Sequence, residues 1–257
     1  MQGDMLKKLT LWFALLFCVP ITLMAAWSAA MGWPDNWHSA DWSSARIAPN
    51  PTGNREAIIQ VYAARAGRWK GVFSVHSWVA IKPEGASGFT RYDVVGWGSP
   101  VRQNGYPVDG MWYGNTPEIV HEIRGEKAQS LVAKIDSAVR SYPHYQRGSY
   151  RAWPGPNSNT FVAWIGRQVP ELGLEMPPNA VGKDYLGEGL RISATPSGTG
   201  WQISAWGLIG LAVGLREGIE INILGATLGV DFDDLGVKLP GIGCVCLSTT
   251  AGSVHIG

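Results

Sequence analysis

The chain has little that would support metal or nucleic-acid chemistry. Its 21 basic and 20 acidic side chains leave a net charge of +1 over 257 residues. A nearly neutral chain without a run of Lys or Arg has no general attraction for nucleic acid, so we expect no nucleic-acid partner. No His and carboxylate side chains have metal-ligand spacing, and we therefore expect no metal site and no cofactor.

Cysteine is also scarce. Of the three cysteines, Cys18 lies in an apolar N-terminal segment, and Cys244 and Cys246 form a Cys-x-Cys pair that is too sparse for a zinc site of four ligands. A disulfide within this pair would be strained, because alternate residues of a strand are about 6.5–7 Å apart. Either thiol remains a rival nucleophile, although the nearest histidine in sequence is His255, near the C-terminus.

Charge is absent from residues 9–34. The segment from Leu9 to about Met31 is long enough to cross a bilayer of roughly 30 Å. Lys7 and Lys8 precede it, and paired lysines favour a cytoplasmic N-terminus. We therefore predict a single-pass anchor that leaves the rest of the chain on the far side of the membrane.

A cleaved signal peptide is the alternative to this anchor. The small residues Ser28-Ala29-Ala30 suit a signal peptidase. The apolar run is longer than a signal core of about 7–15 residues, which favours an anchor. An interfacial belt is also expected, formed by Trp27, Trp33, Trp37 and Trp42.

The rest of the chain predicts one α+β domain. Thirty-three glycines favour strands over a helical bundle. The expected organisation is an anchor or signal peptide at 1–33, a linker at 34–56, a globular domain at 57–234 and an irregular tail at 235–257. Strands are expected at 58–63, 69–82, 90–97 and 118–123, and helices at 126–142 and from Ser158 to Pro170.

Two later segments are harder to assign. The apolar runs 205–215 and 219–230 are each too short to span a bilayer as a helix, so we predict two buried strands. A helix hairpin or an in-plane segment in the membrane is the alternative, because Gly207, Gly210 and Gly214 recur at small-residue spacing. Residues 243–247 could add an edge strand, and the loop 98–116 could shape a pocket.

The domain is organised around the stretch 153–164, where a Pro-rich turn leads into the helix from Ser158. Two prolines exclude regular structure up to Pro156, and the next four residues are polar. Ser158 could simply cap the helix, as Ser and Asn often do. One capping side chain would suffice, however, which leaves room for a second role.

Asn157-Ser158-Asn159-Thr160-Phe161-Val162 is similar to the Asn-Cys-x-x-Phe-Val that opens the nucleophile helix of permuted papain-like enzymes of the NlpC and lecithin retinol acyltransferase type. Serine stands where these families have cysteine. Their histidine lies on an earlier strand, which Val75-His76-Ser77-Trp78-Val79-Ala80-Ile81 resembles. The resemblance implies an antiparallel sheet packed on a nucleophile-bearing helix.

A broader resemblance covers roughly residues 57–230. The upstream His76-x-Trp78, the block from Trp153 to Phe161 and Gly182-Lys183-Asp184-Tyr185 look like a bacterial domain of unknown function, number 3750. That family implies a shared fold and no known activity. A bacterial source would place the anchor in the inner membrane and the domain in the periplasm.

These patterns lead to a catalytic hypothesis. Ser158 would attack an acyl carbon of an amide or ester, His76 would take its proton, and N–H groups at the helix start would hold the oxyanion. Asp93 would orient His76, unless the strand register slips by one residue and presents Tyr92 instead. Substrate contacts are expected from Asn157, Asn159, Trp78, Trp153 and Tyr150.

Non-catalytic functions form the alternative. A cleft lined by Trp78, Trp153 and Trp164 could bind a peptide, a glycan or a lipid acyl chain of the cell envelope without chemistry. The domain could also be a structural partner of another envelope protein. In each case the membrane is a partner through residues 9–31.

Overall fold

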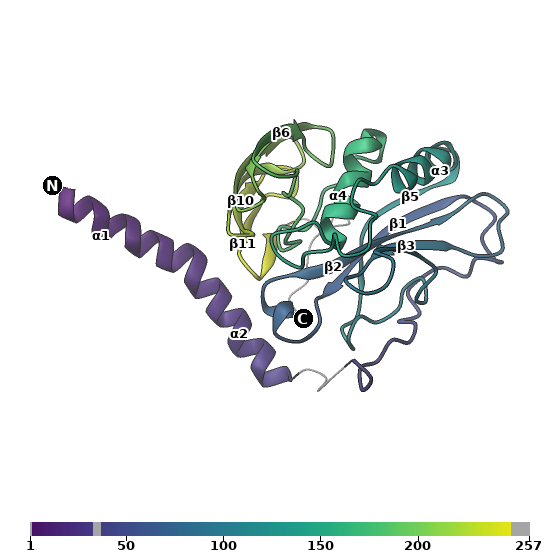
Figure 1. Cartoon of the computed structure of the whole chain (residues 1–257), viewed down its shortest axis with the longest axis horizontal. Coiled ribbons are helices and arrows are strands. Elements are labelled where there is room, and N and C mark those ends of the chain that lie inside the picture. Colours follow the sequence, from purple (N-terminus) through teal and green to yellow (C-terminus); the bar gives the residue numbers. More distant parts are fainter. Residues whose placement is uncertain (1, 33–36, 248–257) are drawn as a thin grey trace.

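The N-terminal segment is one long helix that projects from the domain (Figure 1). The computed structural model describes residues 2–32 and 37–247. Helix α1 (Gln2–Phe13) continues through a π-helical turn, η1 (Ala14–Cys18), into α2 (Val19–Met31). The helix is long and apolar enough to cross a membrane. A signal sequence would have the same properties, so the choice between anchor and signal peptide stays open.

The first sheet has five antiparallel strands in the order β4-β3-β2-β1-β5. Its strands are β1 (Ile58–Arg65), β2 (Val75–Lys82), β3 (Thr90–Val94), β4 (Val101–Gln103) and β5 (Glu118–Arg124). The second strand is shorter than predicted, because a 3₁₀ turn, η2 (Arg68–Val72), occupies the first part of the expected strand 69–82. Strands β2 and β3 pair as an antiparallel hairpin.

Two helices cover one face of this sheet. They are α3 (Gly125–Arg140) and α4 (Ser158–Gln168), and a short 3₁₀ turn, η3 (Pro170–Leu172), follows α4. The core between sheet and helices is apolar, with Val79, Ile135 and Phe161 fully buried. Both helices begin within a residue of the predicted positions, since the 3.6-residue apolar period and the flanking Gly and Pro residues set them.

The other face of the five-stranded sheet is covered by irregular chain. Residues 37–56, predicted as a linker, pack here. Asp109 accepts hydrogen bonds from Ser44 Oγ at 2.6 Å and from the N–H of Ile47 at 2.7 Å. Trp42 stacks on Tyr106 within this layer. Trp33 lies outside the described residues.

The second sheet is a seven-stranded antiparallel meander in the order β12-β11-β10-β9-β8-β7-β6. Its strands are β6 (Leu190–Ala194), β7 (Gly200–Ala205), β8 (Ile209–Gly214), β9 (Gly218–Ile223), β10 (Ala226–Asp231), β11 (Gly236–Leu239) and β12 (Gly243–Cys246). Helix α4 lies between the two sheets (Figure 1). Part of the predicted tail, 235–257, therefore forms strands, and residues 248–257 lie outside the described part of the chain.

The prediction of two buried strands at 205–215 and 219–230 is wrong in its burial. Three strands, β8 to β10, occupy this region, and their apolar side chains face outward while polar ones are buried. On the inner face Lys238 Nζ lies 2.9 Å from Glu220 Oε1, and Lys183 Nζ lies 2.5 Å from Glu220 Oε2. All three side chains are almost inaccessible to solvent.

Class and architecture agree with the prediction at the coarse level. The fold is α+β, with antiparallel sheets and an apolar N-terminal helix. The finer prediction, a permuted papain-like arrangement, depends on how Ser158 and His76 are placed.

Candidate binding cavity

One cavity of about 820 Å³ lies where the N-terminal helix meets the domain. The helix contributes Phe13, Phe17, Cys18 and Ile21 to its wall. The domain contributes η2, the loops around Trp97 and Trp112, the segment 150–153 and the β9–β10 turn. Polar groups gather on one side, where Ser74, His76 and the start of α4 line the cavity. Apolar walls with a few polar groups on one side are typical of small-molecule sites.

Asn157, rather than Ser158, caps helix α4. Its Oδ1 accepts the N–H of Asn159 at 2.9 Å and that of Thr160 at 3.1 Å. Thr160 Oγ1 completes a capping box by accepting the N–H of Asn157 at 3.1 Å. The N–H groups of Asn159 and Thr160 are therefore already bonded and are not free to hold an oxyanion.

Asn159 ties the helix start to strand β2. Its Oδ1 accepts a hydrogen bond from Ser77 Oγ at 2.8 Å, and its Nδ2 donates to the carbonyl oxygen of Val75 at 2.9 Å and to that of Val181 at 2.8 Å. Asn157 and Asn159 do line the cavity, but their side chains are bonded to protein. We conclude that they fix the position of Ser158 between them.

Of the four polar residues 157–160, Ser158 is the one whose side chain does not take part in the hydrogen bonds that hold the start of α4 in place. It lines the cavity, and its hydroxyl has no hydrogen-bond partner among the residues that the structure describes. Removing this hydroxyl would therefore leave the capping network intact. The simple capping role considered from sequence does not apply to Ser158.

His76 lines the same cavity from the beginning of β2. Its ring stacks on Trp112 with centroids 3.6 Å apart and planes 4° apart. Successive strand residues alternate between faces, and Ser77 points to α4, so His76 projects to the opposite face of the sheet. The cavity extends around the beginning of β2, and it is therefore lined both by His76 and by the start of α4 on the other face of the sheet. Within the described chain, no hydrogen bond joins His76 to Ser158.

Burial dominates the electrostatics of His76. It holds the pKa of the imidazole well below its ordinary value, and the nearby Arg91 guanidinium adds to this effect. Nε2 is buried and has no hydrogen-bond partner within the described ranges. His76 is consequently neutral near pH 7 and has one ring nitrogen without a partner.

Asp93 is on the same sheet face as His76, but it forms an ion pair with Arg91. Its Oδ2 lies 3.0 Å from Arg91 Nη2, and both side chains are 1% exposed. Val79 pairs with Tyr92, so Asp93 is level with Trp78 and two residues along from His76. Burial raises the pKa of Asp93, against the opposing effect of Arg91. The predicted register holds, since Tyr92 points to the helices and donates to Asp136 Oδ1 at 3.0 Å.

The predicted aromatic contacts divide into two groups. Tyr150 and Trp153 line the cavity, and Trp153 Nε1 donates to the carbonyl oxygen of Leu224 at 2.8 Å. Trp78 is fully buried away from it, with Nε1 bonded to the carbonyl oxygen of Val108 at 2.8 Å. Trp164 donates to the carbonyl oxygen of Ala138 at 3.0 Å and packs on the main core.

Much of the cavity wall was not foreseen from sequence. The expectation that the loop 98–116 shapes a pocket identified the neighbourhood of Trp112 and Tyr113. The contributions of Phe17 and of the β9–β10 turn had no local signal, because they arise from packing between distant segments. No single-sequence pattern reports such contacts.

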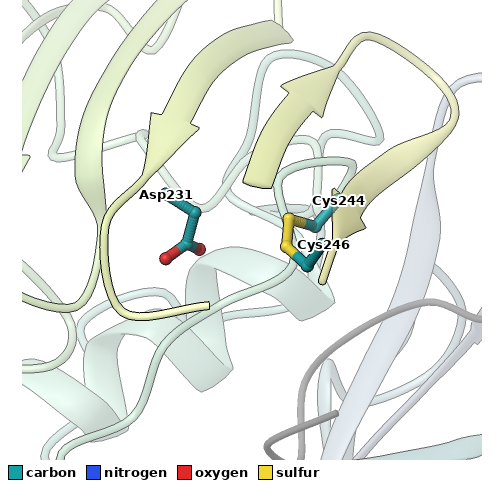
Figure 2. A group of neighbouring side chains, drawn as sticks. All are labelled: Asp231, Cys244 and Cys246. Carbon is teal, nitrogen blue, oxygen red and sulfur yellow. A yellow bond between two sulfur atoms is a disulfide. The ribbon is translucent and has the colours of Figure 1, made fainter. Parts of the chain in front are cut away.

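The two C-terminal cysteines lie apart from this cavity, beside Asp231 (Figure 2). They form a disulfide with a Cα–Cα distance of 5.5 Å, shorter than the extended-strand spacing used in the prediction. Asp231 already accepts the N–H groups of Asp233 and Asp234 at 3.0 Å. With both thiols oxidised, this group offers no open set of metal ligands.

Comparison with known proteins assigns the middle part of the chain, which includes His76 and Ser158, to a recognised family. Residues 56–185 match the family described as Protein of unknown function (DUF3750), which is just over half of the chain. The chain belongs to this family. The DUF3750 match covers the five-stranded sheet, α3 and α4, and it ends before the seven-stranded sheet, short of the residue 230 expected from sequence. The chain matches no curated protein and no solved structure.

Proposed function

We propose that this protein is a membrane-anchored binding protein whose cavity holds the acyl chain of a lipid or lipid-linked molecule. The observation that carries the proposal is the composition of the cavity wall. Phe13, Phe17 and Ile21 of the N-terminal helix form one side, and aromatic residues of the domain form the other. A volume of about 820 Å³ is within the range of roughly 300–1,000 Å³ typical of ligand pockets.

The proposed route of entry is lateral, from the bilayer. If the helix spans the membrane, Phe13 and Phe17 lie at hydrocarbon depth, and the cavity they border is reached from the acyl layer without crossing water. Lys7 and Lys8 orient the helix with its N-terminus in the cytoplasm, which puts the domain on the periplasmic side of a bacterial inner membrane.

The polar side of the cavity suits the head group of such a ligand. Ser158 offers a hydroxyl, His76 a neutral imidazole and Lys70 an exposed ammonium group. The positive end of the α4 dipole lies behind Ser158 and favours an ester, carboxylate or phosphate oxygen there. We therefore propose that an acyl lipid binds with its polar end toward Ser158.

A second candidate function is acyl chemistry at Ser158, in line with the papain-like resemblance. The observation that favours it is that the Ser158 hydroxyl has no partner among the described residues and shares its cavity with His76. Ser158 Oγ would add to the acyl carbon while His76 takes its proton. The leaving group would depart with that proton, and water or an acceptor hydroxyl would then release the acyl group.

Filling the cavity tests the binding proposal. Ala226 lines the cavity from β10, and Ala226→Trp should block the acyl chain. The indole ring would occupy the space of the acyl chain, so we expect about tenfold or greater loss of co-purifying acyl lipid, which corresponds to about 1.4 kcal/mol or more of binding free energy. The measurement is mass spectrometry of lipids retained by the full chain after purification in detergent.

The matched control is Ala133→Trp on the exposed face of α3. This variant should retain lipid as the unmodified chain does, including any lipid bound loosely to the N-terminal helix. Equal lipid content in both variants and the unmodified chain would overturn the binding proposal.

A further inference from the structure

The seven-stranded sheet has its polarity reversed. Its inner face buries charged and polar side chains, among them Gln202, Glu220 and Lys238. Its outer face exposes apolar side chains in a continuous row, each directly opposite the next across β7 to β12: Trp201, Val213, Ile219, Val230, Val237 and Val245. These six side chains are between 39% and 69% exposed.

Such a face is unusual for a protein surrounded by water. Sheets of soluble proteins place apolar side chains inside and polar ones outside, and large contiguous apolar patches mark interaction sites. At strand spacings of about 4.8 Å, seven strands form a surface roughly 29 Å wide. Apolar side chains outside and polar ones inside is the pattern of strands that face lipid.

The two ends of the sheet differ in charge. The turns at 206–208, 224–225 and 240–242 are uncharged and include Trp206 and Leu224, which are 52% and 59% exposed. The turns at the opposite end carry the exposed charged residues Arg216 and Asp233, beside exposed Leu215, Phe232 and Leu235, while Glu217 and Asp234 of the same turns are buried. One end of the sheet therefore suits hydrocarbon, and the other suits water or lipid head groups.

The uncharged end lies against the N-terminal helix. Strand β10 contacts η1, which is in the middle of the helix Asp4–Met31. The β9–β10 turn also shares the cavity wall with Phe13 and Phe17. In Figure 1 the seven-stranded sheet lies on the side of the domain that faces this helix, as does the turn η2, which contacts α2. Whatever layer of the bilayer surrounds the middle of the helix must also surround this turn.

We propose that the outer face of the seven-stranded sheet is a membrane-inserted surface, with its uncharged turns in the acyl layer and its charged turns at the head groups. This inference rests on the membrane attachment in the proposed function and is independent of what the cavity binds. The sheet is open at β6 and β12, so full immersion would leave edge groups unpaired. The proposed insertion is therefore partial, with the edges toward the head groups.

Spin labels on the full chain in phospholipid vesicles test this proposal. Single cysteines replace Ile209 and Ile221, exposed apolar residues of β8 and β9 near the uncharged turns, in a Cys18→Ala background, because Cys18 is the free cysteine of the described residues and the other two form a disulfide. The readout is collision of the label with oxygen, which concentrates in acyl chains, and with a polar nickel chelate, which stays in water. Ala133→Cys on exposed α3 is the matched control, and a label on native Cys18 marks the middle of the helix.

Labels at 209 and 221 are expected to resemble the Cys18 label, with nickel collision at least about tenfold below that of the label at 133. Nickel collision equal to that at 133 would show that the face is in water and would overturn the proposal. Low collision with both reagents, or spin–spin broadening, would show a protein partner or a second copy on the face and would also overturn it. The collision rates of the labels report on the outer sheet face whether or not the cavity holds lipid. A negative result in this experiment is therefore distinguishable from a negative result in the lipid-binding experiment.

Discussion

Replacing Lys238 by methionine is expected to lower the free energy of unfolding by about 3–5 kcal/mol, the usual cost of removing one partner from a buried ion pair. Lys238 Nζ lies 2.6 Å from Glu175 Oε1, 2.9 Å from Glu220 Oε1 and 3.3 Å from Asp231 Oδ2, and the lysine is 0% exposed. Methionine would remove the lysine partner of Glu175 and Asp231 and would leave Glu220 paired with Lys183 alone. Burial already raises the pKa of Glu175 to about 8.

The measurement is urea unfolding of the full chain in detergent micelles, followed by tryptophan fluorescence. Lys134→Met is the matched control, because Lys134 pairs with Glu171 at the surface, where both side chains are about half exposed. Exposed pairs contribute about 0–1 kcal/mol, so this variant should unfold near the midpoint of the unmodified chain. Equal midpoints for the two lysine variants would show that the inner face of the second sheet does not depend on its charge network.

Ser158→Ala is expected to abolish any acyl-transfer activity, by a factor on the order of a million, while changing the free energy of unfolding by less than about 1 kcal/mol. The rate loss follows from removing a nucleophile. The small stability change follows because Asn157 makes the cap. Because burial holds the pKa of His76 low, its base form persists through neutral pH, and the rate should fall only as the solution becomes acidic. Hydrolysis of p-nitrophenyl acyl esters and urea unfolding measure the two effects.

Ser158→Cys supplies the complementary test. Cysteine is nearly the same size and would restore the nucleophile of the papain-like families, so it should react with thiol-directed acyl probes and lose that reactivity in a His76→Gln background. An unreactive Ser158→Cys, together with unchanged activity in Ser158→Ala, would remove the catalytic candidate. The binding proposal would be unaffected by that result.

Local signals made much of the first sheet predictable. The runs that became β1, β3 and β5, and the apolar period of α3, lie next to Gly and Pro residues that set their boundaries. The stretch before Ser158 predicted the start of α4 for the same reason. At the site, the strand of His76 and the helix start at Ser158 were both located, and they border one cavity.

The second sheet could not be predicted in the same way. Alternation along β7 to β10 is clear, but it does not say which set of side chains is buried. The prediction of two buried strands rested on the apolar composition of the runs 205–215 and 219–230 and on their being too short to span a bilayer as helices. Here Lys183 and Lys238 provide buried counterions for Glu220, and they come from segments distant in sequence. Such long-range pairing decides the orientation of the sheet.

The roles of single residues were set by contacts that the sequence does not single out. Asp93 was a reasonable partner for His76 because both lie on one sheet face, yet Arg91, two residues away, takes its carboxylate. Trp78 resembled a cleft residue and is instead stacked on Tyr62 in the core. Sequence located the cavity's polar side but did not reveal that the N-terminal helix forms its opposite wall.

Photolabelling is the most direct test of the central claim, that the cavity holds an acyl chain drawn from the membrane. The full chain would be placed in vesicles with a phospholipid that carries a diazirine at the end of one acyl chain, irradiated and digested for peptide mapping. We predict labelled peptides that contain His76 and Ser158, and loss of that labelling in Ala226→Trp but not in Ala133→Trp. Label confined to the N-terminal helix and the outer sheet face, with the same pattern in both variants, would contradict it.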